Sequence, residues 1–332
     1  MRQTMSERHT SGLEPGQMWL TRKTVDRRIE FRGHGLHGGQ PALLQVLPAP
    51  AGHGIVFVRS DLPVGEGRIE ARYDLVSDTR LCTRLTNEFG ASVSTIEHLM
   101  AALAGAGVSD ALIRIDGAEV PILDGSAQPF TQGLARVGLR ALPMAVRGMR
   151  ILEPVSVVDG DRVAELRPSP GGPAMSLDLE FEIDFDDAAI GRQKYAMSLS
   201  PDGFAAELAD CRTFCKLAEV EGLRKIGLAQ GGGLENAIVV DQGRVLNPEG
   251  LRRPDEFVRH KMLDAVGDLA LAGSPILGRY VGKRAGHEMT NRLLHALFAA
   301  PDCWEWAEAI PTAALPTRRR MTVEGNRTAL AV

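Results

Sequence analysis

The sequence feature that most constrains the fold is the order of its strand-like and helix-like segments. In both halves of the sequence, short runs of apolar and β-branched residues come first, and longer segments with helical periodicity follow. Strand-like segments lie at 28–31, 42–47, 54–58, 111–115 and 155–158, and helix-like segments lie at 94–103, 128–137, 255–272 and 287–300. Runs of strands followed by runs of helices are typical of α+β proteins. We therefore expect mostly antiparallel sheets that pack against helices.

A stretch that contains proline and glycine, at 142–148, separates the two halves. The chain has 332 residues, enough for two domains of roughly 150 residues each. We therefore predict a first α+β domain at 21–145 and a second α+β domain at 146–312. The polar residues 1–20 are expected to form a flexible N-terminal extension, and residues 313–332 a C-terminal tail.

The composition limits the functions that the chain can have. Hydrophobic residues make up 44% and charged residues 24%, so a chain of this length can bury a large core without a structural metal. A bound metal would therefore serve chemistry. The formal net charge is -4 with dispersed basic residues, which gives no reason to expect nucleic-acid binding. No apolar run is long enough for a signal peptide or a membrane span, so we expect a cytoplasmic protein.

The four cysteines form no CxxC pair and no dense framework. This pattern favours free thiols in a reducing compartment, which agrees with a cytoplasmic location. Cys211 and Cys215 are four residues apart, and we expect them to share one face of a helix as small buried side chains.

The segment 255–268 carries the first candidate for a chemical site. On a helix, a step of four residues returns to nearly the same face, so His260, Asp264 and Asp268 point roughly one way. An imidazole and a carboxylate at positions i and i+4 can bind one divalent ion. The alternative is a solvated polar face with a helical His–Asp pair.

The segment 94–99 carries the second candidate. Ser94 and Glu97 match the S-x-x-E pattern of a capping box, in which Glu97 would only close the N-terminus of a helix. Alternatively, His98 is a third metal ligand and Glu97 is a general base beside it. A hydrolytic zinc site needs three protein ligands, an open position for water and a carboxylate that takes the proton of that water. That set would be supplied by Glu97, His98, His260 and Asp264.

The third candidate is His287, which follows Gly286 at the predicted start of a helix. The helix dipole and a nearby zinc ion would lower the pKa of His287, and a carboxylate partner such as Asp268 would raise it. A histidine under these opposing influences suits proton donation or oxyanion stabilisation near neutral pH. The alternative is a partly exposed histidine in the first turn of a helix.

Taken together, these motifs resemble one protein family. The resemblance is carried by five segments in order along the chain, 94–103 (STIEHLMAAL), 120–127 (VPILDGSA), 212–214 (RTF), 257–264 (FVRHKMLD) and 286–287 (GH). They are similar to the zinc-dependent UDP-3-O-acyl-N-acetylglucosamine deacetylase family, from about residue 24 to residue 300. That family carries out the committed step of lipid A synthesis in Gram-negative bacteria.

The resemblance implies two similar α+β domains, each a sheet packed on helices, with the active site at the domain interface. It also implies one Zn2+ per chain, for which Fe2+ could substitute. The implied zinc ligands are His98, His260 and Asp264. The implied general base is Glu97.

By the same resemblance, His287 stabilises or protonates the transition state and Asp268 orients His287. Thr213 is implied to donate to the tetrahedral oxyanion. The residues implied to bind the substrate are Lys261, Phe214, Asp184 and Phe185.

The implied reaction is metal-assisted hydrolysis of the acetamide of UDP-3-O-(3-hydroxyacyl)-N-acetylglucosamine, in which Glu97 removes a proton from water and acetate is released. Whether Glu97 or His287 protonates the leaving amine stays open. The expected partner is this small-molecule substrate. We expect a monomer, with no nucleic-acid partner and no membrane span.

Two other functions are open from the residues alone. A metal-free hydroxyacyl dehydratase would use a histidine and a glutamate on an acyl thioester, but it would not explain the HxxxD helix. A non-catalytic protein could bind nucleotide-linked lipid precursors without releasing acetate. Metal analysis separates the first alternative from a deacetylase, and an acetate-release assay separates the second.

Overall fold

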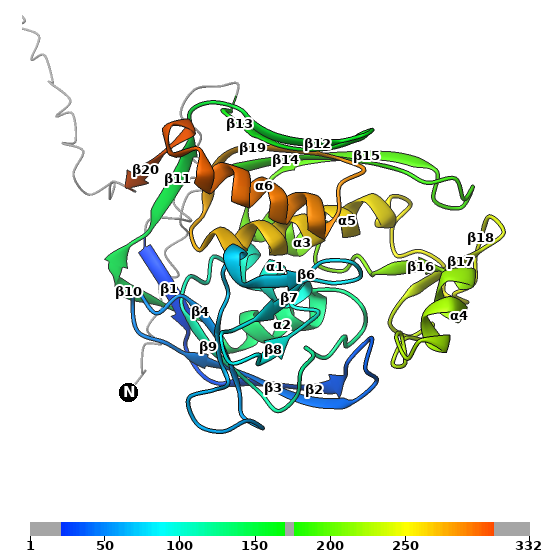
Figure 1. Cartoon of the computed structure of the whole chain (residues 1–332), viewed down its shortest axis with the longest axis horizontal. Helices are drawn as coiled ribbons and strands as arrows, with labels where there is room; N and C mark the ends of the chain where they lie inside the picture. The colour runs from blue at the N-terminus through cyan, green and yellow to red at the C-terminus, as the bar shows by residue number, and fades with distance from the viewer. Residues whose placement is uncertain (1–20, 170–175, 309–332) are drawn as a thin grey trace, which may run out of the picture.

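Strands and helices form separate layers in the computed structural model, which describes residues 21–169 and 176–308 (Figure 1). Most strand pairs are antiparallel, and helices pack against the sheets, so the predicted α+β class is confirmed. The predicted N-terminal extension at 1–20 and C-terminal tail at 313–332 lie outside the described residues. The last residues of the second predicted domain, 309–312, also lie outside them.

The first half of the chain builds a five-stranded sheet with helices on one face. Its strands, in spatial order, are β2 (Ile29–His34), β3 (Pro41–Pro48), β9 (Ala111–Ile115), β4 (Ile55–Arg59) and β5 (Arg68–Glu70), and only the β4–β9 pair is parallel. The helices are α1 (Glu97–Ala106) and α2 (Gln128–Val137). The rings of Phe31 on β2 and Phe130 on α2 pack edge to face with centres 4.9 Å apart. Alternate side chains of the strands therefore form a core with the helices.

Two smaller sheets accompany this half. Strand β1 (Thr21–Val25) pairs with β10 (Leu139–Ala145). Strands β6 (Val76–Asp78), β7 (Arg84–Thr86) and β8 (Ser92–Val93) form a three-stranded sheet after the short 3₁₀ helix η2 (Tyr73–Leu75). The turn between β6 and β7 ends in the buried residues Cys82 and Thr83.

The second half builds a seven-stranded sheet. Strands β12 (Val155–Asp159), β13 (Arg162–Arg167), β19 (Ile276–Lys283), β11 (Arg147–Ile151) and β20 (Trp304–Glu308) follow one another in space, while β14 (Leu177–Asp184) pairs with β19 and with β15 (Arg192–Ser198). The helices that accompany this sheet are α3 (Pro201–Glu207), α5 (Glu256–Leu269), η3 (Ala270–Ala272), α6 (His287–Ala299) and η4 (Pro301–Cys303).

A small sheet projects from one side of the second half (Figure 1). It consists of β16 (Phe214–Lys216), β17 (Ile238–Asp241) and β18 (Arg244–Val245), and helix α4 (Leu217–Lys225) connects its first two strands. The parallel pairing of β16 with β17 needs such a crossover.

The helices of the two halves face each other between the two large sheets, and α1 lies along α5 (Figure 1). Gly267 on α5 permits this close approach, because a Cβ atom at that position would overlap the backbone carbonyl oxygen of Glu97. The first turn of α1 is therefore held against the middle of α5. These are the two helices that carry the first two candidate motifs.

The stretch 142–148, which we predicted as a connection between domains, is not a loop. Its residues belong to the end of β10 and the start of β11, with Val146 between them. Pro143 is tolerated because β10 belongs to a two-stranded sheet whose register shifts opposite this position. Strands β10 and β11 belong to different sheets, so the chain changes sheet near the predicted limit at 145/146. The domain limits themselves stay a prediction.

The expectation that Cys211 and Cys215 share a helix face is wrong. Cys211 lies between α3 and β16, and Cys215 lies within β16, where the backbone pairs with β17 instead of coiling. The four cysteines are free thiols. Burial raises the pKa of the Cys82 thiol to about 12 and that of Cys215 to about 11, so neither is a reactive thiolate near neutral pH.

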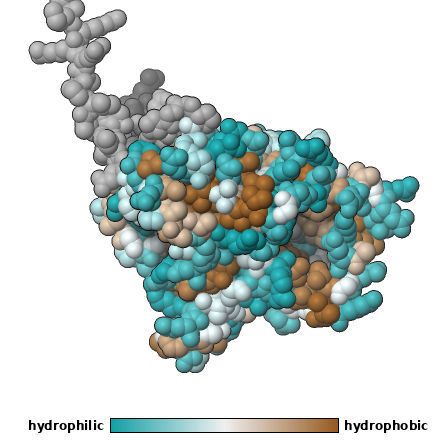
Figure 2. Space-filling view, turned by 45° about the horizontal axis from the view of Figure 1, so that its top comes forward, coloured by the Kyte–Doolittle hydropathy of each residue, from teal (hydrophilic) through white to brown (hydrophobic). Residues whose placement is uncertain are grey.

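The face of the molecule drawn in Figure 2 is mostly hydrophilic, with apolar patches between polar side chains. Large apolar side chains that stay exposed include Phe89, Ile226 and Leu234. Within the two described ranges, each helix is too short or too polar to cross a lipid bilayer.

Candidate metal centre and active site

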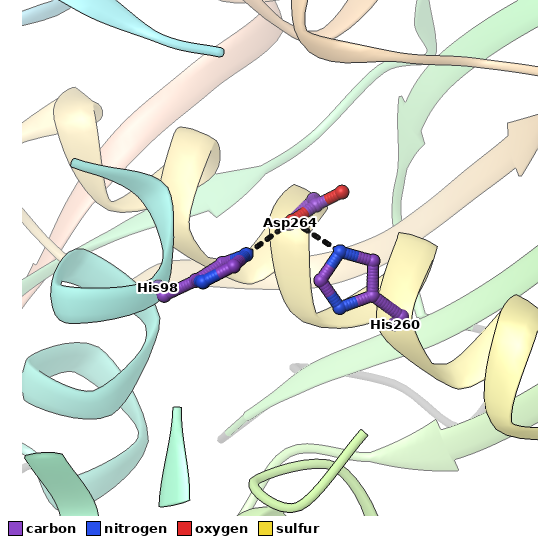
Figure 3. Close-up of side chains that lie close together, drawn as sticks. All are labelled: His98, His260 and Asp264. Carbon is purple, nitrogen blue, oxygen red and sulfur yellow. Dashed lines mark ion pairs between the residues drawn. The ribbon is translucent and has the colours of Figure 1, made fainter. Parts of the chain in front are cut away.

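His98, His260 and Asp264 converge between α1 and α5 (Figure 3). One potential ligand atom from each lies within 4.8 Å of the others, and none of the three residues is more than 5% exposed. Oδ1 of Asp264 lies 3.5 Å from Nε2 of His98 and 3.4 Å from Nε2 of His260. Among the described residues, this buried oxygen has no hydrogen-bond partner. Two imidazoles and a carboxylate around an unsatisfied acceptor fit a divalent cation such as Zn2+.

A backbone carbonyl orients His260. Nδ1 of His260 donates to the carbonyl oxygen of Cys211 at 3.1 Å, so Nε2 carries the lone pair that faces Asp264. Burial lowers the pKa of His260 to about 3, which keeps the ring neutral near neutral pH. The neutral imidazole is the form that binds a metal ion.

Asp264 is ionised although it is buried. Burial alone would raise its pKa, but His260 and Lys261 lower the pKa of Asp264 well below its ordinary value. Nζ of Lys261 donates to Oδ2 at 2.9 Å, so Oδ1 is the carboxylate oxygen that faces the two histidine rings and can bind a cation with them. Lys261, predicted to bind the substrate, therefore contacts the cluster through Asp264.

An ion pair that the sequence did not predict anchors the loop before β16. Arg212 is 2% exposed and Glu256, the first residue of α5, is fully buried. Nε and the backbone amide of Arg212 donate to Oε1 of Glu256 at 2.9 and 3.0 Å. The neighbouring Cys211 carbonyl is thereby fixed relative to His260. Arg212 belongs to the RTF segment, but its residue type alone does not reveal this partner.

Glu97 does not form a capping box. It is the first residue of α1, the N-cap is Ile96, and among the described residues no side chain caps this helix end. Ser94 instead donates from Oγ to the carbonyl oxygen of Ala118 at 3.1 Å. The buried Glu97 carboxylate accepts a hydrogen bond from the backbone amide of Thr83 at 3.0 Å. The side chain is therefore available for chemistry beside His98.

Burial also changes the acidity of Glu97. Desolvation raises the pKa of Glu97, while the nearby His287 and His98 oppose that rise. A carboxylate whose pKa is raised is a stronger base than an exposed glutamate. This matches the requirement for a general base.

His287 is the first residue of α6, as predicted, and is held by Asp268 on α5. Nδ1 of His287 donates to Oδ2 of Asp268 at 2.8 Å, and Thr83 donates to the other oxygen, Oδ1, at 2.6 Å. Burial lowers the pKa of His287, but the charge of Asp268 and this hydrogen bond outweigh it and raise the pKa to about 9. The ring therefore carries a proton at neutral pH. The side chain of His287 is 10% exposed at the first turn of α6, and its hydrogen bond to Asp268 favours a role in chemistry over that of a histidine that only occupies this turn.

Phe214 lies close to His260, and Thr213 precedes Phe214 in the chain. The backbone amide of Thr213 donates to the carbonyl oxygen of Gly125 at 2.8 Å, which joins the second and third segments of the family resemblance. The ring of Phe214 stands edge-on to His260 with centres 6.1 Å apart, and Lys261 Nζ lies 5.7 Å from the centre of the Phe214 ring.

The two residues Asp184 and Phe185, which were predicted to bind the substrate, lie in different environments. The ring of Phe185 packs edge to face against Phe214 with centres 5.5 Å apart, so Phe185 lies near the cluster. The exposed Asp184 carboxylate lies 3.8 Å from Nη1 of Arg284. Within the described residues, no hydrogen bond or ion pair joins Asp184 to His98, His260 or Asp264.

Sequence reasoning missed Thr83 and the Cys211 carbonyl, both of which contact site residues. Thr83 lies in a turn with no motif, and a backbone carbonyl carries no residue-type signal.

The fold and the cluster together define a class, namely an α+β protein with a candidate single-metal centre beside a buried carboxylate.

Comparison with known proteins narrows this class to one family. The model of a family described as UDP-3-O-acyl N-acetylglycosamine deacetylase matches residues 22–299. A Phenylobacterium zucineum protein named UDP-3-O-acyl-N-acetylglucosamine deacetylase is 50% identical over 281 residues, which cover 85% of this chain and 94% of that protein. The chain belongs to the UDP-3-O-acyl-N-acetylglucosamine deacetylase family, as the resemblance predicted.

Two further relatives carry the same name. The protein of an Anaeromyxobacter species is 44% identical over 302 residues, covering 91% of this chain and 96% of the relative. The protein of Shewanella frigidimarina is 44% identical over 288 residues, covering 86% and 92%. The matches span nearly the whole of each relative, so both halves of the fold are included.

Proposed function

We propose that this chain hydrolyses the acetamide of UDP-3-O-(3-hydroxyacyl)-N-acetylglucosamine and releases acetate, in the committed step of lipid A biosynthesis. One observation carries the proposal. In a chain of this family, His98, His260 and Asp264 converge in a buried cluster next to the carboxylate of Glu97. The three converging residues are the proposed ligands of one Zn2+ or Fe2+ ion.

The proposed chemistry begins at Glu97. A bound divalent cation would supply Lewis-acid chemistry, lowering the pKa of water and polarising the acetyl carbonyl. Glu97 accepts a proton from the attacking water, and burial supports this role because it raises the pKa of the carboxyl group. The amide of Thr83 holds one carboxylate oxygen in place at 3.0 Å.

His287 and Thr213 act on the negative charge that develops on the acetyl oxygen. His287 holds a proton because Asp268 raises its pKa to about 9, so the ring can stabilise that charge. The same proton can pass to the leaving amine nitrogen, and its presence at neutral pH favours His287 over Glu97 as the donor. Thr213 would donate a second hydrogen bond to the oxyanion.

The proposed substrate-binding residues differ in how strongly their contacts support the role. The edge-to-face pair of Phe185 and Phe214 gives an apolar wall next to His260. Lys261 is a cation beside that wall, although Asp264 already engages its ammonium group. Asp184 pairs with Arg284 at the surface, and its proposed role in binding the nucleotide depends on the family resemblance alone.

The test combines metal quantification with an acetate-release assay on the acylated UDP-sugar. We expect one equivalent of zinc or iron per chain, loss of acetate release after chelation, and recovery on adding Zn2+. Activity that survives complete removal of metal would contradict the proposal and favour a metal-free enzyme. Tight substrate binding without acetate release would favour the non-catalytic binder.

We further propose that the enzyme acts as a monomer in the cytoplasm, where its nucleotide-linked substrate is made. Light scattering on the purified protein is expected to give the mass of one chain. A stable dimer would contradict the expectation.

A further inference from the structure

Thr83 contacts both carboxylates that flank the candidate metal centre. Its backbone amide donates to Oε2 of Glu97 at 3.0 Å, and its hydroxyl donates to Oδ1 of Asp268 at 2.6 Å. Thr83 is 1% exposed, and the two carboxylates are 4% and 3% exposed. Hydrogen bonds from a buried donor to an ionised acceptor are among the stronger ones in proteins.

These two bonds join elements that are far apart in the chain. Glu97 opens α1, and Asp268 lies near the end of α5. Asp268 also accepts the hydrogen bond from His287, which opens α6. A single residue in the turn before β7 is therefore bonded directly to Glu97 and, through Asp268, to His287. The hydroxyl occupies Oδ1, so Oδ2 is left to face the imidazole.

We propose that Thr83 is a positioning residue for deacetylation, with its amide holding Glu97 and its hydroxyl holding Asp268. Thr83 sets the separation between the group that takes a proton from water and the group that carries a proton toward the leaving amine. The inference depends on the proposed function, because it assigns Thr83 a part in that reaction. Glu97 and His287 would touch the reacting atoms, whereas Thr83 acts through them.

A purely structural role is the alternative. Thr83 is buried, so its methyl group and its hydroxyl both fill space in the turn. Thr83→Val keeps nearly the same shape and removes the hydroxyl, and Thr83→Ser keeps the hydroxyl and removes the methyl group. Thr83→Ala removes both and serves if the valine variant does not fold. The backbone amide to Glu97 is present in all three.

The experiment measures kcat, KM and bound metal for these variants in the wild-type and His287→Ala backgrounds. We expect Thr83→Val to lower kcat about 10- to 100-fold, as for a lost hydrogen bond to a charged group, with KM and metal content unchanged. Thr83→Ser should retain most of the activity. In the His287→Ala background, Thr83→Val should add less than about a twofold loss, because residues that act as one unit are not additive.

A matched control is Thr131→Val on α2, where the threonine hydroxyl donates to the carbonyl oxygen of Ala127 at 3.0 Å away from the cluster. This variant should keep the wild-type kcat. The inference is overturned if Thr83→Val keeps full activity, if Thr83→Ser is as damaging as Thr83→Val, or if the loss is equally large without His287. Wild-type protein that releases no acetate would instead overturn the proposed function.

Discussion

Asp268 accepts a hydrogen bond from Nδ1 of His287 at 2.8 Å, and this pair connects α5 to the first residue of α6. The buried carboxylate overcomes the effect of burial and raises the pKa of His287 to about 9. The helix dipole acts in the opposite direction at this position. The pair therefore favours the protonated form of the His287 ring.

The first prediction concerns the pH dependence of activity. The proton of His287 is present below a pKa of about 9 and lost above it, so kcat/KM should fall as the pH rises through about 9. Burial raises the pKa of Glu97, so activity should also fall on the acid side as this base is protonated. Asp268→Asn should move the basic limb to lower pH. A profile of kcat/KM that stays flat from roughly pH 4 to pH 11, on both sides of the two expected limbs, would contradict the acid–base pair.

The second prediction separates metal binding from proton transfer. His98→Ala should lose bound zinc, since it removes one of three ligands. His287→Ala should keep zinc and lose turnover by roughly 100- to 10,000-fold, the range of general acid–base catalysis. Elemental analysis measures the bound zinc, and an acetate-release assay on the same preparations measures turnover. Equal metal content in the two variants would show that the division of roles is wrong.

The third prediction tests the contact between α1 and α5. Gly267→Ala should force the helices apart at the Glu97 carbonyl and lower the free energy of unfolding by about 1–3 kcal/mol. The matched control is Gly222→Ala on α4, where, apart from the neighbouring residues and the backbone of that helix, no described atom lies within 4 Å of the added methyl group. That change should be neutral or stabilising by about 0.5–1 kcal/mol. Equal urea midpoints for the two variants would contradict the account.

The fourth prediction concerns the buried pair that anchors the Cys211 carbonyl. Arg212→Met leaves the Glu256 carboxylate buried without its cationic partner, so it should lower the free energy of unfolding by about 3–5 kcal/mol. The control variant Arg292→Met removes surface ion pairs, and it should change the free energy of unfolding by less than about 0.5 kcal/mol. Urea titrations of both variants provide the comparison. A stability loss in Arg212→Met no larger than in Arg292→Met would count against the anchor.

The spacing of residues on α5 could be read from the sequence, because helical geometry alone places His260 and Asp264 on one face. The fold class could also be predicted, because runs of strand-like segments followed by helix-like segments are typical of sheets that pack against helices. The partner His98 was proposed from chemistry and from the family resemblance. Its approach to α5 depends on Gly267, whose effect is visible only when the two helices are packed.

Other features could not be read from local patterns. The capping-box interpretation failed because α1 begins at Glu97, with Thr95 in a left-handed conformation (φ 57°) just before it. Ser94 therefore lies two residues before the N-cap position, Ile96, and cannot cap the helix. Thr83 and Asp268 are 185 positions apart, so no short motif could reveal their hydrogen bond. Contacts of this kind appear only when tertiary packing is known.

The most direct measurement is anomalous X-ray scattering at the zinc absorption edge from crystals of the zinc-loaded protein. We predict one strong peak per chain within bonding distance of Nε2 of His98, Nε2 of His260 and a carboxylate oxygen of Asp264. A peak at any other residues, or fully active crystals without a peak between α1 and α5, would contradict the account.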